Sequence, residues 1–521
     1  MNASSRSAYY LLFCVFYVAA TVPAYASDDV LPNSWYVDRS LFPKAYGILD
    51  SEPLMFPVDM GDWPVKIDST HQLFLDDYLI ASVENIEREI HHPHKHPNNP
   101  LIVPDEPWED AGIVFQIVRR DEVTGRFRMW YAGHVRYDLP SGISVRFPTL
   151  YAESQDGIHW EKPDLGLFEF ESSKSNNIVI PAGNPFGMII EPNDPDPARR
   201  YKAIVWHEPK YVPREGYFLY TSPDGIHWTR ETEQPLLVSL QGYTMPQSGI
   251  GDTSIFRWDP RLMKYICDVK FVLPGKFRCR GMMESDDLIH WTSPRMTLYP
   301  DELDEPDSQV YGHLSFCYES MWIGFLRMMH TERTGWKQTT IELTASRDGR
   351  HWTRVGKREE FLPLGNPGEW DADYHDPSWD PILVGDELWI YYRSVNRDPS
   401  DKNPNVGHAI GLATLRRDGF VSLNGSDPTG VVITRPLTFA GESLFINAEV
   451  AENGWIKASL LDDARNPIRD FGLEDTVTVK TGGISVPVVW KNIDVYRLPK
   501  GDHVRLQFEI KNAKIYSFWF Q

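Results

Sequence analysis

Short runs of apolar and aromatic residues, separated by polar turns, recur through most of the sequence. Strand-like segments such as 149–153 and 216–220 lead into turns that contain Asp, Gly or Pro. Further hairpin patterns centre on residues 124–125, 259–260 and 385–386, where Gly or Pro separates two strand-like runs. This pattern predicts an all-β fold built from consecutive hairpins.

A turn motif, Ser-x-Asp-(Gly)-x-x-Trp, repeats along the middle of the chain. Its four copies end at the tryptophans of positions 160, 228, 291 and 352, which are 68, 63 and 61 residues apart. A weaker fifth copy lies at 417–420. This spacing suits one four-stranded sheet per repeat, so we predict a five-bladed β-propeller. The motif itself is typical of turn and packing chemistry and identifies no reaction.

The two ends of the chain differ from these repeats. From about residue 431, amphipathic strands such as 443–450 and 504–510 alternate with turns rich in Gly, Asn and Asp, which predicts a β-sandwich. Residues 27–99 are Pro-rich, with one strand-like piece at 73–80, and we expect them to wrap the propeller and reach towards its mouth. The predicted domains are a signal peptide (1–26), an N-terminal wrapping segment (27–104), the propeller (105–428) and a C-terminal β-sandwich (429–521).

The N-terminus carries the features of a secretory signal. Arg6 precedes an apolar run at 11–20, and the small-residue tripeptide Ala24-Tyr25-Ala26 predicts cleavage before Ser27. No later segment approaches the roughly 20 apolar residues that a membrane helix needs. We therefore expect a secreted or periplasmic protein without a membrane segment.

Charge and aromatic content narrow the choice of partners. The formal net charge of −21 repels nucleic acid and acidic membrane surfaces, so neither is an expected partner. Aromatic residues make up 13% of the chain, and aromatic rings can stack on the apolar faces of sugars, although propeller cores also use them. Carbohydrate is the expected partner, and the oligomeric state is left open.

Few cysteines remain once the signal peptide is removed. They are Cys267, Cys279 and Cys317, too few for a disulfide scaffold. We expect at most one bridge, between Cys267 and Cys279 across a hairpin.

Several of these motifs together resemble a known group of enzymes. The Asp-Gly-x-x-Trp turns, the Asn99-Pro100-Leu101 segment before the first blade, and a C-terminal sandwich that ends in residues 512–518 resemble the superfamily of glycoside hydrolase families 32 and 43. The likeness is greatest to secreted bacterial family 32-like proteins. It implies a funnel at the propeller axis and a glycoside hydrolase that cleaves a plant or algal polysaccharide or an oligosaccharide derived from one.

Glycoside hydrolysis needs one carboxylate as nucleophile or base and another carboxyl group as acid. Acids placed just before the first strand of a blade are the candidates. Asp110 in blade one is the candidate nucleophile or base, Asp252 in blade three the candidate acid or stabiliser, and Asp373 in blade five a further catalytic candidate. Blade two has no acid at 183–187, and blade three lacks a Glu-Cys-Pro element, so the chain departs from the family 32 pattern.

The blade-five segment 369–376 holds four acids within eight residues. Such charges repel one another unless they are solvated, protonated, hydrogen-bonded or bound to a cation. A solvated loop, a catalytic cluster and a calcium site are the alternatives, so no cofactor is required and a structural calcium ion stays open. The histidine-rich run 91–96 favours a loop near the funnel mouth over a metal site. The substrate-binding candidates are Arg88, Trp108, Glu109, His313, Asp371, His375 and Arg393.

Three other functions compete with hydrolysis. A glycoside phosphorylase of the five-bladed type needs a single acid and basic residues for phosphate, which the missing blade-two acid allows. A carbohydrate-binding propeller without catalysis is a second alternative. A sialidase-like enzyme is a third, because its turn motif is similar. The spacing here is one residue shorter, and no arginine triad is evident from the sequence.

Overall fold

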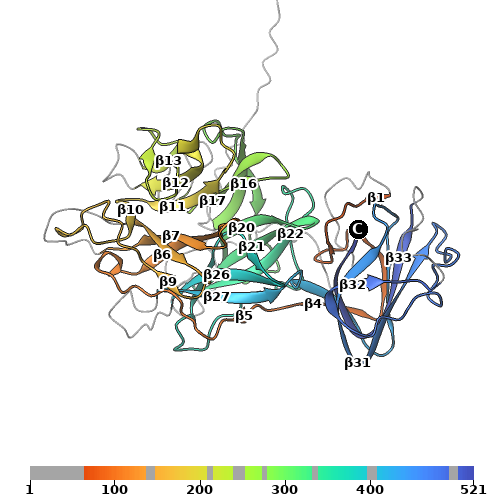
Figure 1. The fold of residues 1–521 in the computed structure, drawn as a ribbon. Coiled ribbons are helices and arrows are strands. Elements are labelled where there is room, and N and C mark those ends of the chain that lie inside the picture. Colours follow the sequence, from red (N-terminus) through yellow and green to blue (C-terminus); the bar gives the residue numbers. More distant parts are fainter. Residues whose placement is uncertain are drawn as a thin grey trace, which may run out of the picture.

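The protein is all-β in the part of the chain that the structure describes. The computed structural model describes residues 64–135, 147–207, 215–238, 251, 253–272, 278–330, 338–395, 408–491 and 503–521 (Figure 1). The helices within these ranges are two short 3-10 turns, η3 (Pro107–Glu109) and η4 (Pro197–Arg199). The predicted fold class is therefore confirmed at the level of all-β structure. No helix in these ranges has the length and apolar character to cross a bilayer.

Most of the strands form five consecutive antiparallel units. Each unit is a run of neighbouring strands joined in chain order. Unit one contains β6 (Ile113–Arg120), β7 (Phe127–Gly133), β8 (Thr149–Ser154), β9 (Trp160–Glu161) and β10 (Ile178–Ile180). Unit two contains β11 (Asn184–Ile190), β12 (Tyr201–His207), β13 (Gly216–Ser222), β14 (Thr229–Arg230) and β15 (Leu237–Val238).

The remaining three units follow the same plan. Unit three contains β16 (Ile255–Asp259), β17 (Lys264–Val272), β18 (Arg278–Ser285) and β19 (Arg295–Leu298). Unit four contains β20 (Ser308–Tyr318), β21 (Met321–His330), β22 (Gln338–Ser346) and β23 (Thr353–Arg354). Unit five contains β24 (Tyr374–Pro377), β25 (Ile382–Val384), β26 (Glu387–Val395), β27 (Ala409–Arg416) and the N-terminal strand β5 (His94–Lys95), which pairs with β27.

The first strands of units one to four lie beside one another, and unit five contacts both of its neighbours. β11 contacts β6 and pairs in parallel with β16, and β16 contacts β20. β24 pairs in parallel with β22, and β26 contacts β6 of unit one. The ends at which the first strands begin are therefore brought towards a common region.

The repeated motif forms a self-contained turn. In the second copy, the Asp224 Oδ1 atom accepts hydrogen bonds from the backbone N–H groups of Ile226 (2.8 Å) and His227 (2.9 Å). The Trp228 Nε1–H group donates to the carbonyl oxygen of Gly225 at 3.0 Å. Gly225 has a φ of 80°, a conformation that favours glycine. The first and third copies repeat all three hydrogen bonds, and the fourth repeats the two backbone bonds to its aspartate, Asp348, which confirms the motif as turn chemistry.

Two of the turns also lie against another unit. The buried Trp130 of unit one donates from Nε1 to the carbonyl oxygen of Gly225 in unit two, at 2.7 Å. In the same way, the Tyr391 hydroxyl of unit five donates to the carbonyl oxygen of Gly157 in unit one, at 2.8 Å. The turn motif therefore stabilises the contacts between units as well as closing a hairpin.

A separate sheet of eight strands contains both N-terminal and C-terminal segments and encloses its own apolar core. Its long strands β31 and β33 pair along most of their length, as the blue end of the ribbon shows (Figure 1). β3 pairs with β29 and β4 with β28, so residues 80–90 join this sheet and do not wrap the propeller as predicted from the sequence. Partners more than 300 residues away leave no local signal of this pairing. The strands are β2 (Gln72–Leu73), β3 (Ile80–Glu84), β4 (Ile86–Ile90), β28 (Val421–Gly425), β29 (Gly430–Thr434), β31 (Leu444–Leu461), β32 (Gly483–Val488) and β33 (Arg505–Phe520).

The predicted disulfide bond is wrong. Cys267 and Cys279 are both free and buried. The register of β17 and β18 places Cys267 opposite Met283 and Cys279 opposite Phe271, so the two sulfur atoms belong to different cross-strand pairs. Burial raises the pKa of the Cys279 thiol to about 12, which makes it unreactive.

Candidate functional site

Charged residues gather where units three, four and five meet. Four arginines and two aspartates on their strands face one another across the unit boundaries, together with two tyrosines near the beginnings of β20 and β24. Gln116 of unit one also reaches this region, because its side chain donates to the backbone of Asp376 at 2.6 Å. We name this group the arginine cluster, and its members are Arg278, Arg280, Arg327, Arg393, Asp268, Asp376, Tyr311 and Tyr374.

One half of the arginine cluster is built around Asp376 of β24. Its Oδ1 atom accepts a short hydrogen bond from Nη1 of Arg327. Its Oδ2 atom lies 3.5 Å from Nη2 of Arg393, a looser ion pair. The side chains of Arg327, Arg393 and Asp376 are 3%, 7% and 9% exposed, so one carboxylate serves two buried cations.

The other half is built around Arg280 of β18, whose side chain is fully buried. Its guanidinium group donates to the carbonyl oxygen of Thr253 at 3.0 Å and to that of Tyr311. Asp268 Oδ1 lies 3.7 Å from Arg280, and Asp268 Oδ2 lies 3.0 Å from Nδ1 of His313. Burial lowers the pKa of Arg280, which reflects the cost of holding its charge away from water.

Two tyrosine rings lie among these cations. The ring centroids of Tyr311 and Tyr374 are 6.4 Å apart. The Cζ atom of Arg327 lies 5.4 Å from the ring centroid of Tyr311, and that of Arg393 lies 4.7 Å from the ring centroid of Tyr374. The register of β20 against β21 shifts at Tyr311, and the Arg327 guanidinium lies where a Cβ atom on Gly312 would stand. Glycine is therefore required at position 312 for this arrangement.

Several buried polar atoms of this region have no hydrogen-bond partner in the part of the chain that the structure describes. Native proteins leave few such atoms unpaired unless water, an ion or a ligand completes them. Among the described residues, the guanidinium groups of Arg327 and Arg393 also face the single carboxylate of Asp376, a formal excess of one positive charge in a chain whose net charge is −21. The unpaired atoms are Nε of Arg280, Arg327 and Arg393, Oδ1 of Asp268, Oδ2 of Asp376, Oε1 of Gln116 and Nε2 of Gln309.

The structure places two of the predicted site residues at the arginine cluster and a third beside it. Arg393 is a member, and His313 contacts it through Asp268. Asp373 directly precedes Tyr374, and its backbone carbonyl accepts from the N–H of Thr339 at 3.1 Å. The catalytic roles of the three predicted acids remain predictions.

The other two catalytic candidates lie before first strands of their units. Asp110 is exposed and follows η3, three residues before β6 begins. Asp252 lies outside the described residues.

Two predicted binding residues lie inside unit one. Glu109 is buried, and its carboxylate accepts from the Tyr131 hydroxyl at 2.7 Å and from Lys162 Nζ at 2.6 Å. Burial raises the pKa of Glu109. Trp108 donates from Nε1 to the side-chain oxygen of Asn177 at 2.8 Å. These contacts are internal to the unit and give both residues a packing role.

Asp371 and His375 are also buried. Asp371 pairs with Lys95 Nζ at 2.6 Å and accepts from the Tyr392 hydroxyl at 3.0 Å. His375 lies 3.1 Å from the carbonyl oxygen of Pro363, and burial lowers its pKa to about 4. Together with the pairing of Asp376, these contacts offset the repulsion expected within the acidic segment 369–376.

Arg88 belongs to the sheet that contains the C-terminal strands. It lies in β4 and forms an ion pair with Asp77. It is therefore not brought together with Arg393.

Most members of the arginine cluster were not predicted from the sequence. A usable signal existed, because β21 and β26 each carry one arginine within a largely buried apolar strand. Arginine is rarely buried unless it is paired, so such a residue marks either an ion pair or a ligand site. No arginine group was evident from the sequence because Arg280, Arg327 and Arg393 are far apart along the chain.

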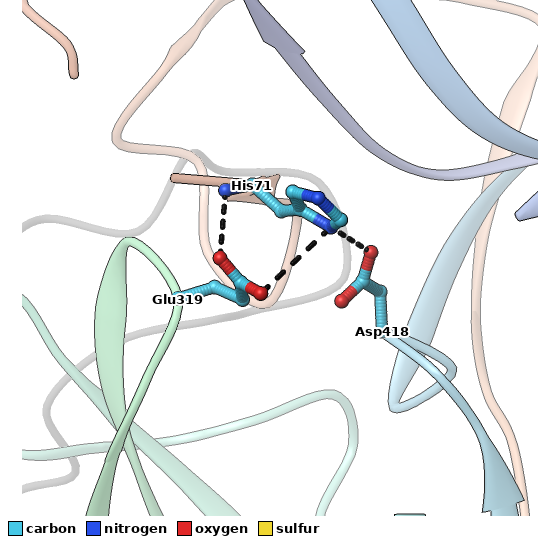
Figure 2. Close-up of side chains that lie close together, drawn as sticks. All are labelled: His71, Glu319 and Asp418. Carbon is cyan, nitrogen blue, oxygen red and sulfur yellow. Dashed lines mark hydrogen bonds and ion pairs between the residues drawn. The ribbon is translucent and has the colours of Figure 1, made fainter. Parts of the chain in front are cut away.

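A second cluster of polar groups joins the repeats to the other sheet. His71, Glu319 and Asp418 offer one ligand atom each within 4.8 Å of one another (Figure 2). His71 Nδ1 lies 2.6 Å from Asp418 Oδ2, and the backbone N–H of His71 donates to Glu319 Oε2 at 3.0 Å. The His71 ring stacks on Trp519, with ring centroids 3.8 Å apart.

The carboxylates of this second cluster are already engaged. Asp418 also accepts from the hydroxyl groups of Tyr318 (2.8 Å) and Ser517 (2.6 Å), and Glu319 pairs with Arg417 at 3.1 Å. These contacts describe a connection between unit four and the strands at both ends of the chain. Within the described residues, Glu305, Asp307 and His330 form the other group with metal-ligand spacing.

Comparison with known proteins gives only distant structural likenesses. No family model matches the chain. No curated protein matches it either. A solved structure described as a glycoside hydrolase is 14% identical, with 62% of this chain and 92% of that chain covered and a TM-score of 0.44.

Two further solved structures lie at a similar distance. An N-acetylgalactosamine deacetylase from F. plautii, in complex with blood group B trisaccharide, is 16% identical over 65% of this chain and 97% of its own, with a TM-score of 0.44. A structure from the GH130 family of mannoside phosphorylases, which contains glycoside hydrolases that target beta-1,2 mannosidic linkages in Candida mannan, is 12% identical over 66% of this chain and 96% of its own, with a TM-score of 0.40. Likenesses at this level assign neither a family nor an activity to the chain.

Proposed function

We propose that the five antiparallel units are the blades of a five-bladed β-propeller, and that the protein is a secreted glycoside hydrolase acting on a plant or algal glycan. The blade assignment is supported by the contacts between successive first strands and by those between units five and one. In such an arrangement the beginnings of the first strands surround the axis, which is where ligand sites of this architecture lie.

One observation carries the functional proposal: buried polar atoms that have no partner within the described ranges gather beside two tyrosine rings at these strand ends. Sugars combine hydroxyl groups, which can pair with such atoms, and apolar faces, which stack on aromatic rings. A polar ligand would therefore complete the hydrogen bonds that the arginine cluster leaves open.

The acids for the reaction are Asp110, Asp252 and Asp373 in this proposal. Asp110 and Asp373 each precede a first strand by at most three residues, so both belong to the same end of their units as the arginine cluster. Asp252 is included from its place in the sequence, because it lies outside the described residues. One carboxyl group would protonate the leaving oxygen, and another would attack the sugar or activate water. Asp376 does not take either role, because its oxygens are engaged by Arg327 and Arg393.

The test is a screen of the mature protein against plant and algal polysaccharides and aryl glycosides. The variants are Asp110→Asn, Asp252→Asn and Asp373→Asn, with Asp386→Asn in an exposed turn as the matched control. We expect sugar release by the wild type and the control, and a loss on the order of 100- to 10,000-fold in at least two of the three site variants. Full activity in all three variants would contradict the proposal.

The excess of positive charge favours one alternative, a glycoside phosphorylase in which arginines hold phosphate. The same screen, run with and without phosphate, separates the two reactions, because only phosphorolysis requires phosphate. Binding of a glycan without turnover would instead indicate a carbohydrate-binding propeller.

A further inference from the structure

We propose that the arginine cluster binds an anionic group carried by the glycan itself, either the carboxylate of a uronic acid or a sulfate ester. This inference rests on the proposed function and adds the substrate class. A carboxylate and a sulfate present the same chemistry to a guanidinium group, namely two or more oxygen acceptors with negative charge.

The balance of charge carries the first step. Arg327 and Arg393 share the single carboxylate of Asp376. Nη2 of Arg393 lies 3.5 Å from Oδ2 of Asp376, which is longer than the usual hydrogen bond between charged groups. A buried cation without a full counter-charge is costly to hold. An anion supplied by the ligand would neutralise this excess.

The second step comes from the donors of these arginines that have no acceptor among the described residues. The Nε–H groups of Arg327 and Arg393 are buried and have no acceptor within the ranges that the structure describes. A guanidinium group recognises oxyanions through its planar fork of N–H donors, and Nε–H is one arm of that fork. Asp376 occupies a terminal nitrogen of Arg327 and leaves the Nε arm available.

The third step is that surrounding residues hold the side chains of Arg327 and Arg393 in place. Arg327 lies across Gly312 and above the Tyr311 ring, and Arg393 lies above the Tyr374 ring. Donors held in place before binding lose little conformational entropy on binding. Burial raises the pKa of Tyr374, so its ring stays neutral and adds no competing negative charge.

The tyrosine rings also favour a sugar-borne anion over a free one. Tyr311 and Tyr374 place two aromatic surfaces among the guanidinium groups. A sugar ring can cover such surfaces, whereas a free inorganic anion makes no use of them. The combination of cations and aromatic rings therefore matches a charged sugar.

Isothermal titration calorimetry of the full mature chain tests this inference. The probes are an oligogalacturonate and its methyl ester, a sulfated algal oligosaccharide and its desulfated form, and inorganic phosphate alone. We expect at least one anionic probe to bind, and its uncharged match to bind on the order of 10- to 100-fold more weakly. Equal affinity of every charged probe and its uncharged match would overturn the inference.

Two substitutions of Arg393 connect the affinity to the arginine cluster. Arg393→Met removes the charge and the fork, and we expect it to abolish the preference for the anionic probe. Arg393→Lys keeps the charge without the fork and should retain part of that preference, which also provides a readout if the methionine variant does not fold. Arg200→Met, at an exposed position between β11 and β12, is the matched control. An unchanged preference in Arg393→Lys and Arg393→Met would overturn the inference.

The outcomes separate this inference from the proposed function. Turnover of a neutral glycan, with no preference for charge, supports the glycoside hydrolase and overturns the charged substrate. Tight binding of phosphate alone, together with phosphate-dependent turnover, also overturns it and assigns the arginine cluster to phosphorolysis. Charge-dependent binding by the arginine cluster without any turnover retains the anionic ligand and contradicts the hydrolase.

Discussion

The repeated turns and the arginine cluster differ in how their polar groups find hydrogen-bond partners. In the turns, Asp224 and its three counterparts each accept backbone hydrogen bonds from residues two and three positions further along the chain. In the arginine cluster, ion pairs join residues far apart in sequence, and several buried atoms have no partner within the described ranges. The turns are complete by themselves, whereas the arginine cluster is not.

We infer from this difference that the turns stabilise the fold and that the arginine cluster is a ligand site. The turn recurs in four units with the same backbone hydrogen bonds to its aspartate, so it serves a need that the units share, which is to close hairpins. Two of the turns also join neighbouring units. The arginine cluster occurs once, and its buried cations lack full counter-charges among the described residues. Such an arrangement lowers the free energy of unfolding unless a ligand is bound. We therefore expect substitutions in the two regions to affect different properties.

The largest expected effect is on stability, at a contact of the turns. Trp130→Ala removes a fully buried indole and the donor to the Gly225 carbonyl that joins units one and two. We expect the free energy of unfolding to fall by about 3–5 kcal/mol, measured by chemical denaturation. Ligand affinity at a temperature where the variant is folded should be unchanged. A selective loss of affinity in the folded variant would remove the distinction between the regions.

The next effect concerns a buried histidine outside the arginine cluster. Burial, with a smaller contribution from Arg230, lowers the pKa of His207 from 6.5 to about 4, and the ring lies 3.0 Å from the Tyr220 hydroxyl. Between these pKa values the unfolded state binds more protons than the folded state, so stability is lost as pH falls from 6.5 to 4. We expect His207 to contribute about 3 kcal/mol to this loss.

Thermal unfolding of the wild type and His207→Gln between pH 7 and 4 measures this contribution. The glutamine variant does not titrate in this range, so its unfolding temperature should fall less steeply with decreasing pH. Parallel pH profiles would show that His207 is not held neutral in the folded state.

A smaller effect is expected within a turn. Asp224→Ala leaves the N–H groups of Ile226 and His227 without their acceptor, but these groups are partly accessible to water. We expect a loss of about 1–2 kcal/mol in the free energy of unfolding. Asp287→Ala, the equivalent change in unit three, should give a similar loss because its contacts are the same. Unequal losses would indicate that the four turns are not equivalent.

The same contrast explains how much of the structure the sequence predicted. The turns were predictable because Ser222, Asp224 and Trp228 interact within three residues of one another or with Gly225, so the motif contains its own partners. All-β structure and five repeats of hairpins follow from such local signals. The disulfide prediction failed because it required the register of two strands, which no single residue reveals.

The site was only partly predictable for a related reason. Arg393 was identified from its place in a strand, but its partner Asp376 and the neighbouring Arg327 depend on how units four and five meet. Arg327 and Asp376 are 49 positions apart, and Gln116 and Asp376 are 260 apart. Contacts over such distances are set by the packing of whole units, so the pattern of a single segment does not predict them.

The most direct test of the central claim is the unfolding free energy of Arg393→Met without any ligand. The variant removes one excess buried cation and leaves Asp376 paired with Arg327. We expect the free energy of unfolding to equal or exceed that of the wild type, or to fall below it by no more than about 0.5 kcal/mol. A loss of about 3 kcal/mol or more, comparable with Trp130→Ala, would show that the arginine cluster is a structural ion-pair network and not an incomplete ligand site.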